Sequence, residues 1–576
     1  MNSNVKIYDS QHNAIKFSPN EYMTSGGEGD IYLKKNIVYK IFHQPKNNDF
    51  QNKILLLQKL QHPSLAYPIE SFFDQNQQMI GFSMKKLKAD PVVKMFSSIW
   101  QQNQQFDLEN QLNFINKMRE LLLFVHQKKA IVADGNEMNW LFDSSYQPYL
   151  IDLDSWQIAQ HPATAIMPSI KDWHSQSLNT FTDWFAWAIV SFQILTGIHP
   201  YKGTHPNFKK GDLASRMKAN VSVFHSDVRY SQAVRDFSLI PKPLKDWYYQ
   251  VFEKGLRDIP PTVQIGNLLT NLQIHQTASV QNIQQNLSFL PIQNFSQYLF
   301  VKFLNDQFFL LQISHDFFIF DFSNQNKIPI DSFLAQKLIH KEAFVCKKNT
   351  SVFILYLENN QLCALNLSLK KLIVSSFMAQ QIYFIENRIF ILNLQSDIFI
   401  SEIELQQISN QYIFTLSKNW NLFIQSTQFF SNMAISNNLG NYFSFIPKGK
   451  DNMIVHKINI STQEKWIQAF ATFNSSIVGF TMTKKGLLKK YILELKNQEF
   501  IPILEEDVDT IEDNFSFNSK GILISNQLDS LDIYSSNFHQ HKNIQNSQLK
   551  ESFLFAIDDK FYILKKNYIQ QISLKT

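Results

Sequence analysis

The chain lacks the features that mark secreted, membrane-spanning or nucleic-acid-binding proteins. Its two cysteines, Cys346 and Cys363, are too few for a disulfide framework or a cysteine-rich metal site. No run of about 18 apolar residues occurs, and the opening MNSNVKIYDSQHN has no charged-then-apolar signal pattern. The net charge of +5 is small for 576 residues, and the lysines form no dense basic run. We therefore expect a soluble, cytoplasmic protein without a membrane span or a nucleic-acid partner.

A change in composition near residue 275 divides the chain. Its length exceeds what one compact core usually accommodates. The polar, glutamine-rich stretch HQTASVQNIQQN follows the change, and helical periodicity gives way to short strands beyond it. We predict two domains, residues 1–275 and 291–576, joined by a linker at 276–290.

Three oxygen-bearing side chains stand out in the stretch IVADGNEMNWLFDSSYQPYLIDLDSWQI at residues 131–158. Asp134 is followed five residues later by Asn139, and Asp152 lies thirteen residues beyond that. Carboxylate and amide oxygens are the hard ligands that Mg²⁺ prefers. Aspartate and asparagine are also common in turns for local reasons, so this spacing alone does not identify a site.

A glycine-rich turn precedes a lysine in MTSGGEGDIYLKKNIVYKIF at residues 23–42. Gly26, Gly27 and Gly29 fall in the turn, and Lys40 follows Gly29 by eleven residues. Glycine allows backbone N–H groups to approach phosphate oxygens closely. A plain hairpin turn is the alternative for the glycines, and the following V-Y-K segment disfavours it.

The segment TDWFAWAIVSFQILTGIHPYKG predicts a long buried helix that begins near Asp183. Its apolar run of about eleven residues is too short for a bilayer, which needs about 20. A core helix is therefore expected.

Together these motifs resemble the protein-kinase-like family over residues of about 18–275. The resemblance is closest to a bacterial branch of serine/threonine kinases often encoded beside a metal-dependent protein phosphatase and a von Willebrand A-type protein. Further matching segments are G-F-S-M at Gly81–Met84, I-D-L-D-S-W-Q at Ile151–Gln157 and the helix end F-Q-I-L-T-G-I-H-P. The resemblance implies an α+β bilobal domain, with an N-lobe at about 18–87 and a C-lobe at about 88–275. It also implies ATP and Mg²⁺ as cofactors, a protein substrate, and the phosphatase and the von Willebrand A-type protein as partners.

The resemblance assigns a role to each matching residue. Lys40 would contact the α and β phosphates of ATP, Asn139 and Asp152 would hold Mg²⁺, Asp134 would orient the Ser/Thr hydroxyl and accept its proton, and Asp183 would support the catalytic-loop backbone. The residues that would surround the nucleotide are Gly26, Gly27, Gly29 and Ile31 over the phosphates, Met84 behind the adenine, and Lys85, Lys86 and Leu87 in the hinge.

The chain departs from the kinase pattern at the helix that normally supplies a glutamate partner for the lysine. Aligning ILLLQKLQHP with that helix places Lys53 at the glutamate position, and two cations cannot form the ion pair. Asp49, one turn earlier, is a candidate substitute, and a helix-capping role is the favoured alternative. We interpret the change as altered regulation rather than lost activity.

Other departures lie around the catalytic loop. Val132-Ala133 replaces the usual His-Arg, so no arginine is available there to bind a phosphorylated activation loop. Leu153-Asp154 replaces the usual Phe-Gly after Asp152. Met167-Pro168-Ser169 stands in place of Ala-Pro-Glu, and Ile259 lies near the expected position of its arginine partner, so the pattern predicts loss of that ion pair.

The second half predicts an all-β domain, because short apolar runs alternate with polar turns and helices are hard to place. Loose repeats of 36 to 46 residues, typical of four-stranded propeller blades, start at Gln297, Glu342, Met378, Leu422, Gln468, Asp509 and Phe553. We predict a seven-bladed β-propeller, with a pair of β-sandwiches as the alternative.

Three hypotheses for function follow. The first is an active Ser/Thr protein kinase whose propeller recruits substrates or regulators, supported by Lys40, Asp134, Asn139 and Asp152. The second is a pseudokinase scaffold that binds or senses nucleotide, supported by Lys53. The third is a small-molecule phosphotransferase, which the long segment after Asp183 disfavours.

Overall fold

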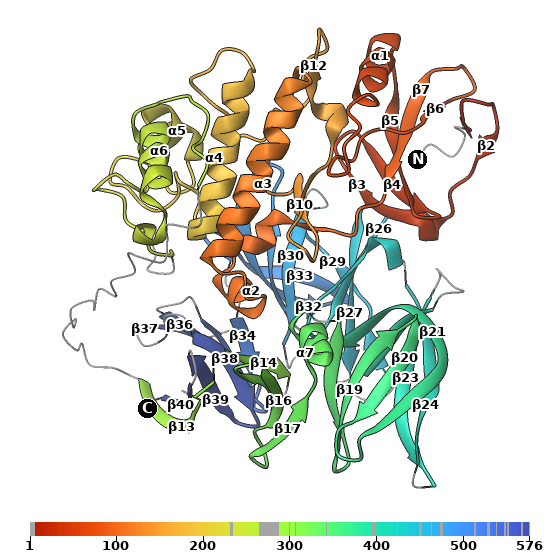
Figure 1. The fold of residues 1–576 in the computed structure, drawn as a ribbon, viewed down its shortest axis with the longest axis vertical. Helices are drawn as coiled ribbons and strands as arrows, with labels where there is room; N and C mark the ends of the chain where they lie inside the picture. The colour runs from red at the N-terminus through yellow and green to blue at the C-terminus, as the bar shows by residue number, and fades with distance from the viewer. Residues whose placement is uncertain are drawn as a thin grey trace.

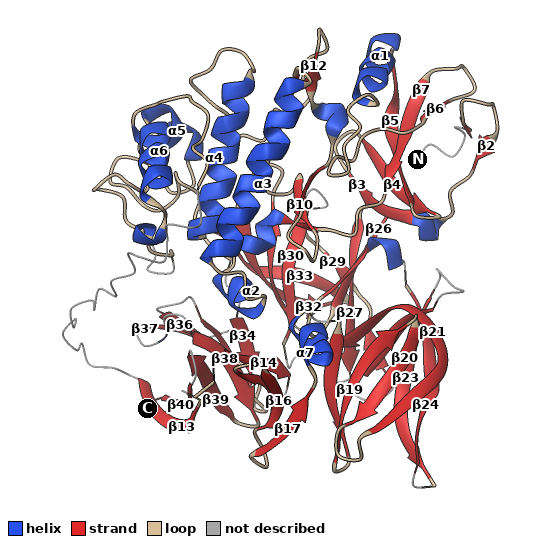
Figure 2. Ribbon diagram, viewed as in Figure 1, coloured by secondary structure: helices blue, strands red, loops and turns tan. Residues whose placement is uncertain are grey.

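In the computed structural model most helices lie in the N-terminal half beside a sheet, and the C-terminal half consists mainly of strands (Figures 1 and 2). The structure describes residues 6–230, 234–263 and 287–574, with gaps in the last range at 296, 299, 306, 341, 386–387, 394–398, 410, 423, 449–451, 462–463, 473–475, 512–513, 527–529, 537, 539, 547–548, 550–551 and 566–567. The predicted boundary at 275 and most of the predicted linker lie outside the described residues. The last part of that linker segment, 287–290, belongs to strand β13 (Leu287–Asn294).

The chain begins with an antiparallel sheet in the order β2-β1-β6-β7-β5-β4-β3. Its strands are β1 Ile7–Tyr8, β2 Ala14–Ile15, β3 Tyr22–Ser25, β4 Gly29–Lys34, β5 Ile37–Lys46, β6 Ser71–Phe73 and β7 Met79–Lys85. Helix α1 (Asn48–Leu57) follows β5, and the side chain of Asn47 caps it by accepting a hydrogen bond from the Phe50 N–H. Ile54 and Leu57 bury one face of this helix.

Two long helices form the centre of the following part. They are α3 (Leu108–Gln127) and α4 (Thr180–Thr196), joined by the shorter α2 Ser98–Asn103, α5 Leu213–Ala219 and α6 Lys242–Glu253. Asn179 caps α4 by accepting hydrogen bonds from the Phe181 and Thr182 N–H groups, and the helix ends at Gly197 with φ of 82°. Every residue of α4 from Thr182 onward is buried, as its apolar sequence predicts. Among the described residues, no helix has both the length and the apolar character needed to cross a membrane.

Short strands hold the stretch from residue 131 to 158 beneath the first sheet. One small sheet has the order β11-β10-β8, and β12 pairs with β9. The bounds are β8 Asp90–Pro91, β9 Ala130–Ile131, β10 Trp140–Phe142, β11 Pro148–Leu150 and β12 Gln157–Ile158. The residues predicted to carry chemistry lie in the loops after β9 and β11.

The C-terminal region is built of sheets whose strands pair antiparallel except for the short parallel pair β29 and β33, which confirms the prediction of a β-rich second half. The first groups of strands are β14 Phe300–Asn305, β15 Phe308–Ile313, β16 Asp316–Asp321 and β17 Asn326–Ile330, then β18 Ala343–Lys348, β19 Ser351–Glu358, β20 Gln361–Asn366, β21 Lys371–Ile385, β22 Arg388–Asn393, β23 Phe399–Ile408 and β24 Gln411–Asn421. The next are β25 Thr427–Phe429, β26 Ala434–Asn438, β27 Asn441–Lys448, β28 Asn452–Ile454, β29 Lys457–Ile458, β30 Lys465–Ala471, β31 Ile477–Met482, β32 Leu488–Lys496 and β33 Glu499–Val508. The last are β34 Asn514–Phe517, β35 Leu523–Asn526, β36 Ser530–Tyr534, β37 His541–Gln545, β38 Ser552–Ile557, β39 Lys560–Lys565 and β40 Tyr568–Leu574.

The two ends of this region meet in one sheet of order β13-β40-β39-β38. Strand β21 is long enough to pair with β20 through its first half and with β22 through its second. Helix α7 (Ser332–Ile339) interrupts the strands, whereas the sequence pattern had indicated no helix in this half. The sequence SFLAQKLI is short and largely apolar, and the side chain of Asp331 fixes its helical start by accepting a hydrogen bond from the Leu334 N–H.

The helical part and the β-rich region share a hydrophobic core. Phe480 and Met482 of β31 and Leu488 of β32 belong to the same buried cluster as the residues of α3 and α4. The Nζ of Lys202 donates a hydrogen bond of 2.9 Å to the carbonyl of Val508 at the end of β33. The β-rich region therefore packs directly against the part of the chain that carries the predicted site.

Candidate functional site

The central strand β5 presents Lys40 to the interior, where this residue is 8% exposed. Lys40 is paired with Ile31 on β4 and with Phe82 on β7. The neighbouring strands approach closely at two glycines. A Cβ on Gly29 would lie 2.4 Å from the Ile41 carbonyl oxygen, and one on Gly81 would lie 2.5 Å from that of Lys40. Glycine at these two positions therefore allows β4 and β7 to approach β5 closely on either side of Lys40.

The ammonium of Lys40 binds two carboxylates from the segment after β11. Its Nζ donates a hydrogen bond of 2.7 Å to Asp152 Oδ1, although the two residues are 112 positions apart in the sequence. It also donates to both oxygens of Asp154, at 2.9 and 2.7 Å. Burial opposes the charge on Lys40, but these two carboxylates outweigh it and raise the pKa of the lysine. Lys40 therefore stays cationic.

Asp154 is the functional residue that the sequence pattern missed. Its side chain is 1% exposed, and burial raises its pKa above the ordinary value while Lys40 opposes that shift. The neighbouring Lys53 donates instead to the Pro162 carbonyl at 2.9 Å, and burial lowers its pKa to about 8. Asp49, the candidate substitute partner, binds the Nδ1 of His161 at 3.1 Å rather than Lys40. The available signal for Asp154 was a second carboxylate two residues after Asp152.

The loop after β9 brings Asp134 and Asn139 together. The Nδ2 of Asn139 donates a hydrogen bond of 2.9 Å to the Asp134 carbonyl, which leaves the amide oxygen of Asn139 as a possible ligand. The N–H of Ile151 donates to the Asn139 carbonyl at 3.1 Å and so links this loop to Asp152. These oxygens from Asn139 and Asp152 form a donor set of the kind that suits Mg²⁺.

Two residues of the site have left-handed backbone conformations although neither is glycine. These are Ala133, with φ of 62°, and Asp152, with φ of 61°. Such conformations cost free energy and persist where the surrounding structure imposes them, as often happens at functional sites. Here the backbone around Ala133 is held by Asp183.

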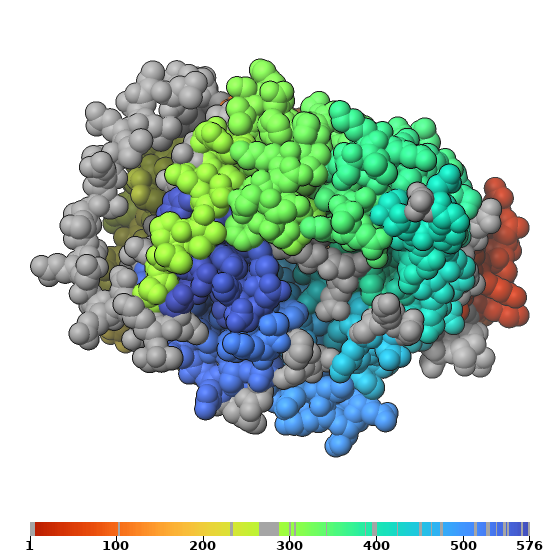
Figure 3. Space-filling model, turned by 90° about the horizontal axis from the view of Figure 1, so that it is seen from below, coloured from red at the N-terminus to blue at the C-terminus, as the bar shows by residue number. Residues whose placement is uncertain are grey.

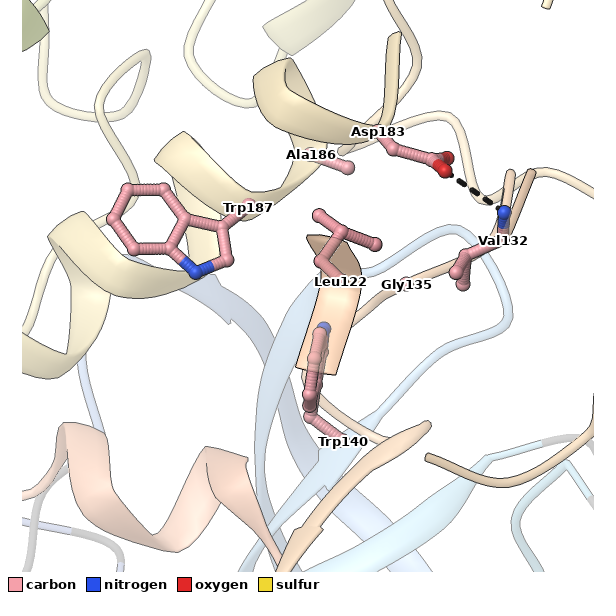
Figure 4. A pocket seen from close by; sticks show the side chains of 7 residues that line it. All are labelled: Leu122, Val132, Gly135, Trp140, Asp183, Ala186 and Trp187. Atoms are coloured by element: carbon pink, nitrogen blue, oxygen red, sulfur yellow. Dashed lines mark hydrogen bonds between the residues drawn. The ribbon is translucent and has the colours of Figure 1, made fainter. Parts of the chain in front are cut away.

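Asp183, at the start of α4, is buried beneath the loop (Figure 4). Its carboxylate accepts hydrogen bonds from the N–H groups of Val132 at 2.9 Å and of Ala133 at 2.8 Å. The Nε2 of His126 also donates to it, at 2.9 Å. The cavity beside Asp183 measures about 10 Å³, enough for about one water molecule and too small for a substrate.

The carboxylate of Asp134 is engaged by the segment that follows β12. Its Oδ1 accepts a hydrogen bond of 2.7 Å from the N–H of Met167, and burial raises its pKa. A second cavity of about 170 Å³ lies next to this segment and is lined by Ala133, Ile166 and Ile170, among others. This cavity lies next to Ala133, on the side of residues 166–178, and Asp134 is not among its lining residues.

An ion pair that the sequence pattern did not predict fixes the end of this segment. Arg257 donates from Nε to Asp172 Oδ2 at 2.7 Å and from Nη2 to Asp172 Oδ1 at 2.8 Å. Two parallel hydrogen bonds of this kind are strong and directional. Asp172 and Arg257 lie three residues after Ser169 and two before Ile259, the two positions at which the sequence pattern predicted the loss of an ion pair.

The remaining predicted residues lie around Lys40 on the same sheet. The turn between β3 and β4 contains Gly26 and Gly27, and the Gly26 N–H donates to the Gly29 carbonyl at 2.8 Å. Met84 and Lys85 end β7, with Met84 half-buried and Lys85 exposed. The segment after β7 also contains Lys86, which is exposed, and Leu87, which is half-buried.

Searches of known protein families and of curated proteins found no match to this chain.

Proposed function

We propose that the chain is an ATP- and Mg²⁺-dependent protein serine/threonine kinase. The observation that carries the proposal is the contact of Lys40 with Asp152 beside the loop of Asp134 and Asn139. A lysine on a central strand, a catalytic carboxylate and two metal ligands, brought together from distant positions, are the parts that phosphoryl transfer requires. When bound, ATP would supply the phosphoryl group and Mg²⁺ would neutralise its charge.

The chain's own residues then have distinct tasks. Lys40 holds Asp152 and faces the phosphates, and the turn of Gly26 and Gly27 covers them with backbone N–H groups. Asp134 orients the Ser or Thr hydroxyl and accepts its proton, which its raised pKa favours. Asp183 fixes the loop that carries Asp134.

The finer architecture is part of the same proposal. The sheet with α1, followed by the helical part around α3 and α4, fits a bilobal kinase-like domain with Lys40 and Asp152 at the junction. Asp172 and Arg257 fit the ion pair that normally anchors the end of the activation segment.

The C-terminal sheets support a seven-bladed propeller. The strands of this region form five sheets, two of which are larger, β18–β24 and β25–β33. Dividing the first of these at β21 and the second between β29 and β33 would give seven units of about four strands each. The pairing of β13 with β40 would close the ring with strands from both ends of the region. Figure 3 shows the chain passing around this face in sequence order, from green through teal to dark blue. Such a propeller would recruit a protein substrate or regulator, and the family resemblance implies a metal-dependent phosphatase and a von Willebrand A-type protein as candidates.

The test is transfer from γ-labelled ATP with Mg²⁺ in the full-length protein and in Asp152→Ala and Asp134→Ala variants. We expect labelling on Ser or Thr that both variants abolish. Asp246→Ala, which removes a carboxylate from the surface of α6, is the matched control and should label as the wild type does. Labelling that survives in both site variants would refute the proposal.

The second candidate is a pseudokinase scaffold. It is favoured by the hydrogen bond from the Met167 N–H, which occupies the Asp134 oxygen that a substrate hydroxyl would need. Nucleotide binding without any transfer to added protein substrates would support this candidate over the kinase.

A further inference from the structure

The turn between β31 and β32 is seated on the segment that engages Asp134. Gly486 in this turn has φ of 75°, and a Cβ there would lie 2.1 Å from Ser169 Oγ and 2.8 Å from Met167 Sδ. Any side chain at this position would have to displace these two neighbours, so only glycine fits here. The β-rich region thus reaches the edge of the candidate catalytic site through residues 483–487.

The same turn carries Lys484 to the glycine-rich turn on the other side of the site. The Lys484 Nζ lies 3.6 Å from the position that a Cβ on Gly27 would occupy. Gly27 lies between β3 and β4, where the backbone N–H groups are expected to cover the phosphates. One exposed ammonium of the β-rich region therefore stands at the proposed phosphate cradle.

A second ammonium comes from strand β30. Lys465 is paired with Met482, the last residue of β31, so it lies at the same end of the hairpin as the turn. Its charge interacts with those of Asp152 and Asp134, as well as with those of Lys40 and Lys484. Lys465 keeps solvent-accessible surface, yet the surrounding protein desolvates it and lowers its pKa.

Among the described residues, the side-chain ammonium groups of Lys465 and Lys484 form neither a hydrogen bond nor a close ion pair. Lys40, by contrast, is bound by both Asp152 and Asp154, which leaves one negative charge in excess in that group. Asp134 adds another. Mg²⁺ held by Asn139 and Asp152 would offset part of this negative charge, and Lys465 and Lys484 supply further positive charge at that place.

We propose that Lys465 and Lys484, supplied by the β-rich region, bind the phosphate groups of the nucleotide. Lys484 contacts the phosphates from the side of the Gly27 turn, and Lys465 contacts them between Asp134 and Asp152. This inference rests on the proposed function, because it assumes that the site receives Mg-ATP. It makes the β-rich region a part of the nucleotide site.

The experiment is calorimetric titration of the full-length protein with Mg-ATP and, separately, with adenosine, which lacks phosphates. Lys465→Ala and Lys484→Ala should each weaken Mg-ATP binding about tenfold, which corresponds to about 1.4 kcal/mol, and leave adenosine binding unchanged. Lys485→Ala removes the same charge from the adjacent exposed position of the turn and is the matched control, with an expected change below about twofold. Lys465→Arg, which keeps the charge, should retain most of the affinity.

Each other result has a definite meaning. Unchanged Mg-ATP affinity in both alanine variants, with binding by the wild type intact, overturns this inference and leaves the proposed function standing. Tighter Mg-ATP binding by the variants overturns it as well, since the lysines would then obstruct the site. Equal losses for Mg-ATP and adenosine would show an effect on the fold rather than on phosphates. Absence of binding by the wild type overturns both proposals.

Discussion

Replacing Asp154 by asparagine should destabilise the protein more than the same change at Asp152. Asp154 is 1% exposed and accepts two hydrogen bonds from the Lys40 ammonium, whereas Asp152 is 34% exposed and accepts one. Removing one partner of a buried ion pair costs about 3–5 kcal/mol. Lys40 keeps Asp152 as a partner and asparagine keeps an acceptor, so we expect about 2 kcal/mol for Asp154→Asn and about 1 kcal/mol for Asp152→Asn.

Urea unfolding followed by tryptophan fluorescence measures this difference. Seven of the nine tryptophans precede residue 276, so the signal reports mainly on the part that contains Lys40. Asp49→Asn is the control, because Asp49 was the partner that the helix alignment suggested. The side chain of Asp49 is 66% exposed and pairs with His161. It should cost less than about 0.5 kcal/mol.

The direct contact can be isolated with a double-mutant cycle of Lys40→Met and Asp154→Leu. Each single change leaves a buried charge without one of its partners, so the double variant should be more stable than the sum of the single losses predicts. The reasoning would be refuted if Asp154→Asn cost less than Asp152→Asn, or if Asp49→Asn were the most harmful of the three. Either result would mean that Asp154 is not the main buried partner of Lys40.

Three further predictions follow from other contacts. Asp183→Ala should lower the free energy of unfolding in urea by about 3 kcal/mol, because the Val132 and Ala133 N–H groups lose their buried acceptor. The same change should abolish phosphoryl transfer. Unimpaired transfer would contradict this role. Gly29→Ala should cost about 1–3 kcal/mol, because the new Cβ would meet the Ile41 carbonyl, whereas Gly26→Ala, with its nearest atom at 3.6 Å, should change the melting temperature little. Burial lowers the pKa of His199 to about 3, so as the pH falls below about 6.5 the unfolded chain binds a proton at this histidine before the folded chain does. The free energy of unfolding should therefore fall by about 1.4 kcal/mol per pH unit, down to about pH 3. A His199→Gln variant should show a flatter dependence of stability on pH in urea titrations between about pH 7 and 5.

The linear pattern named Lys40, Asp134, Asn139 and Asp152 as members of one site. The structure joins Lys40 to Asp152 and Asn139 to Asp134 by hydrogen bonds, but the pattern did not name Asp154. Of the predicted repeat starts, Gln297, Glu342 and Phe553 lie within three residues of the first residue of a strand, β14, β18 and β38. Met378 and Gln468, in contrast, lie inside β21 and β30. Alternation of apolar runs and turns is a local property of the chain.

Which carboxylate pairs with which cation was not predictable from the local sequence. The alignment directed attention to Lys53 and Asp49 on α1, but the partner of Lys40 is Asp154, which the 3₁₀ turn Leu153–Ser155 carries into the interior. The ion pair of Asp172 and Arg257 joins residues 85 positions apart. Which carboxylate meets which cation depends on backbone paths that periodicity does not encode.

The two carboxylates on Lys40 and the position of the β-rich region are connected through charge. With Lys53 on α1, the carboxylate that fixes Lys40 comes from Asp154, on the same segment as Asp152. That places two carboxylates on one lysine and makes the site more negative than a pairing with a single acid would. Lys465 and Lys484 offset this excess from outside the helical part, and the shared core around Phe480 holds their hairpin in place. A substitution that removes one of these charges therefore changes the net charge of the site, and with it the effect of replacing each of the other charged residues.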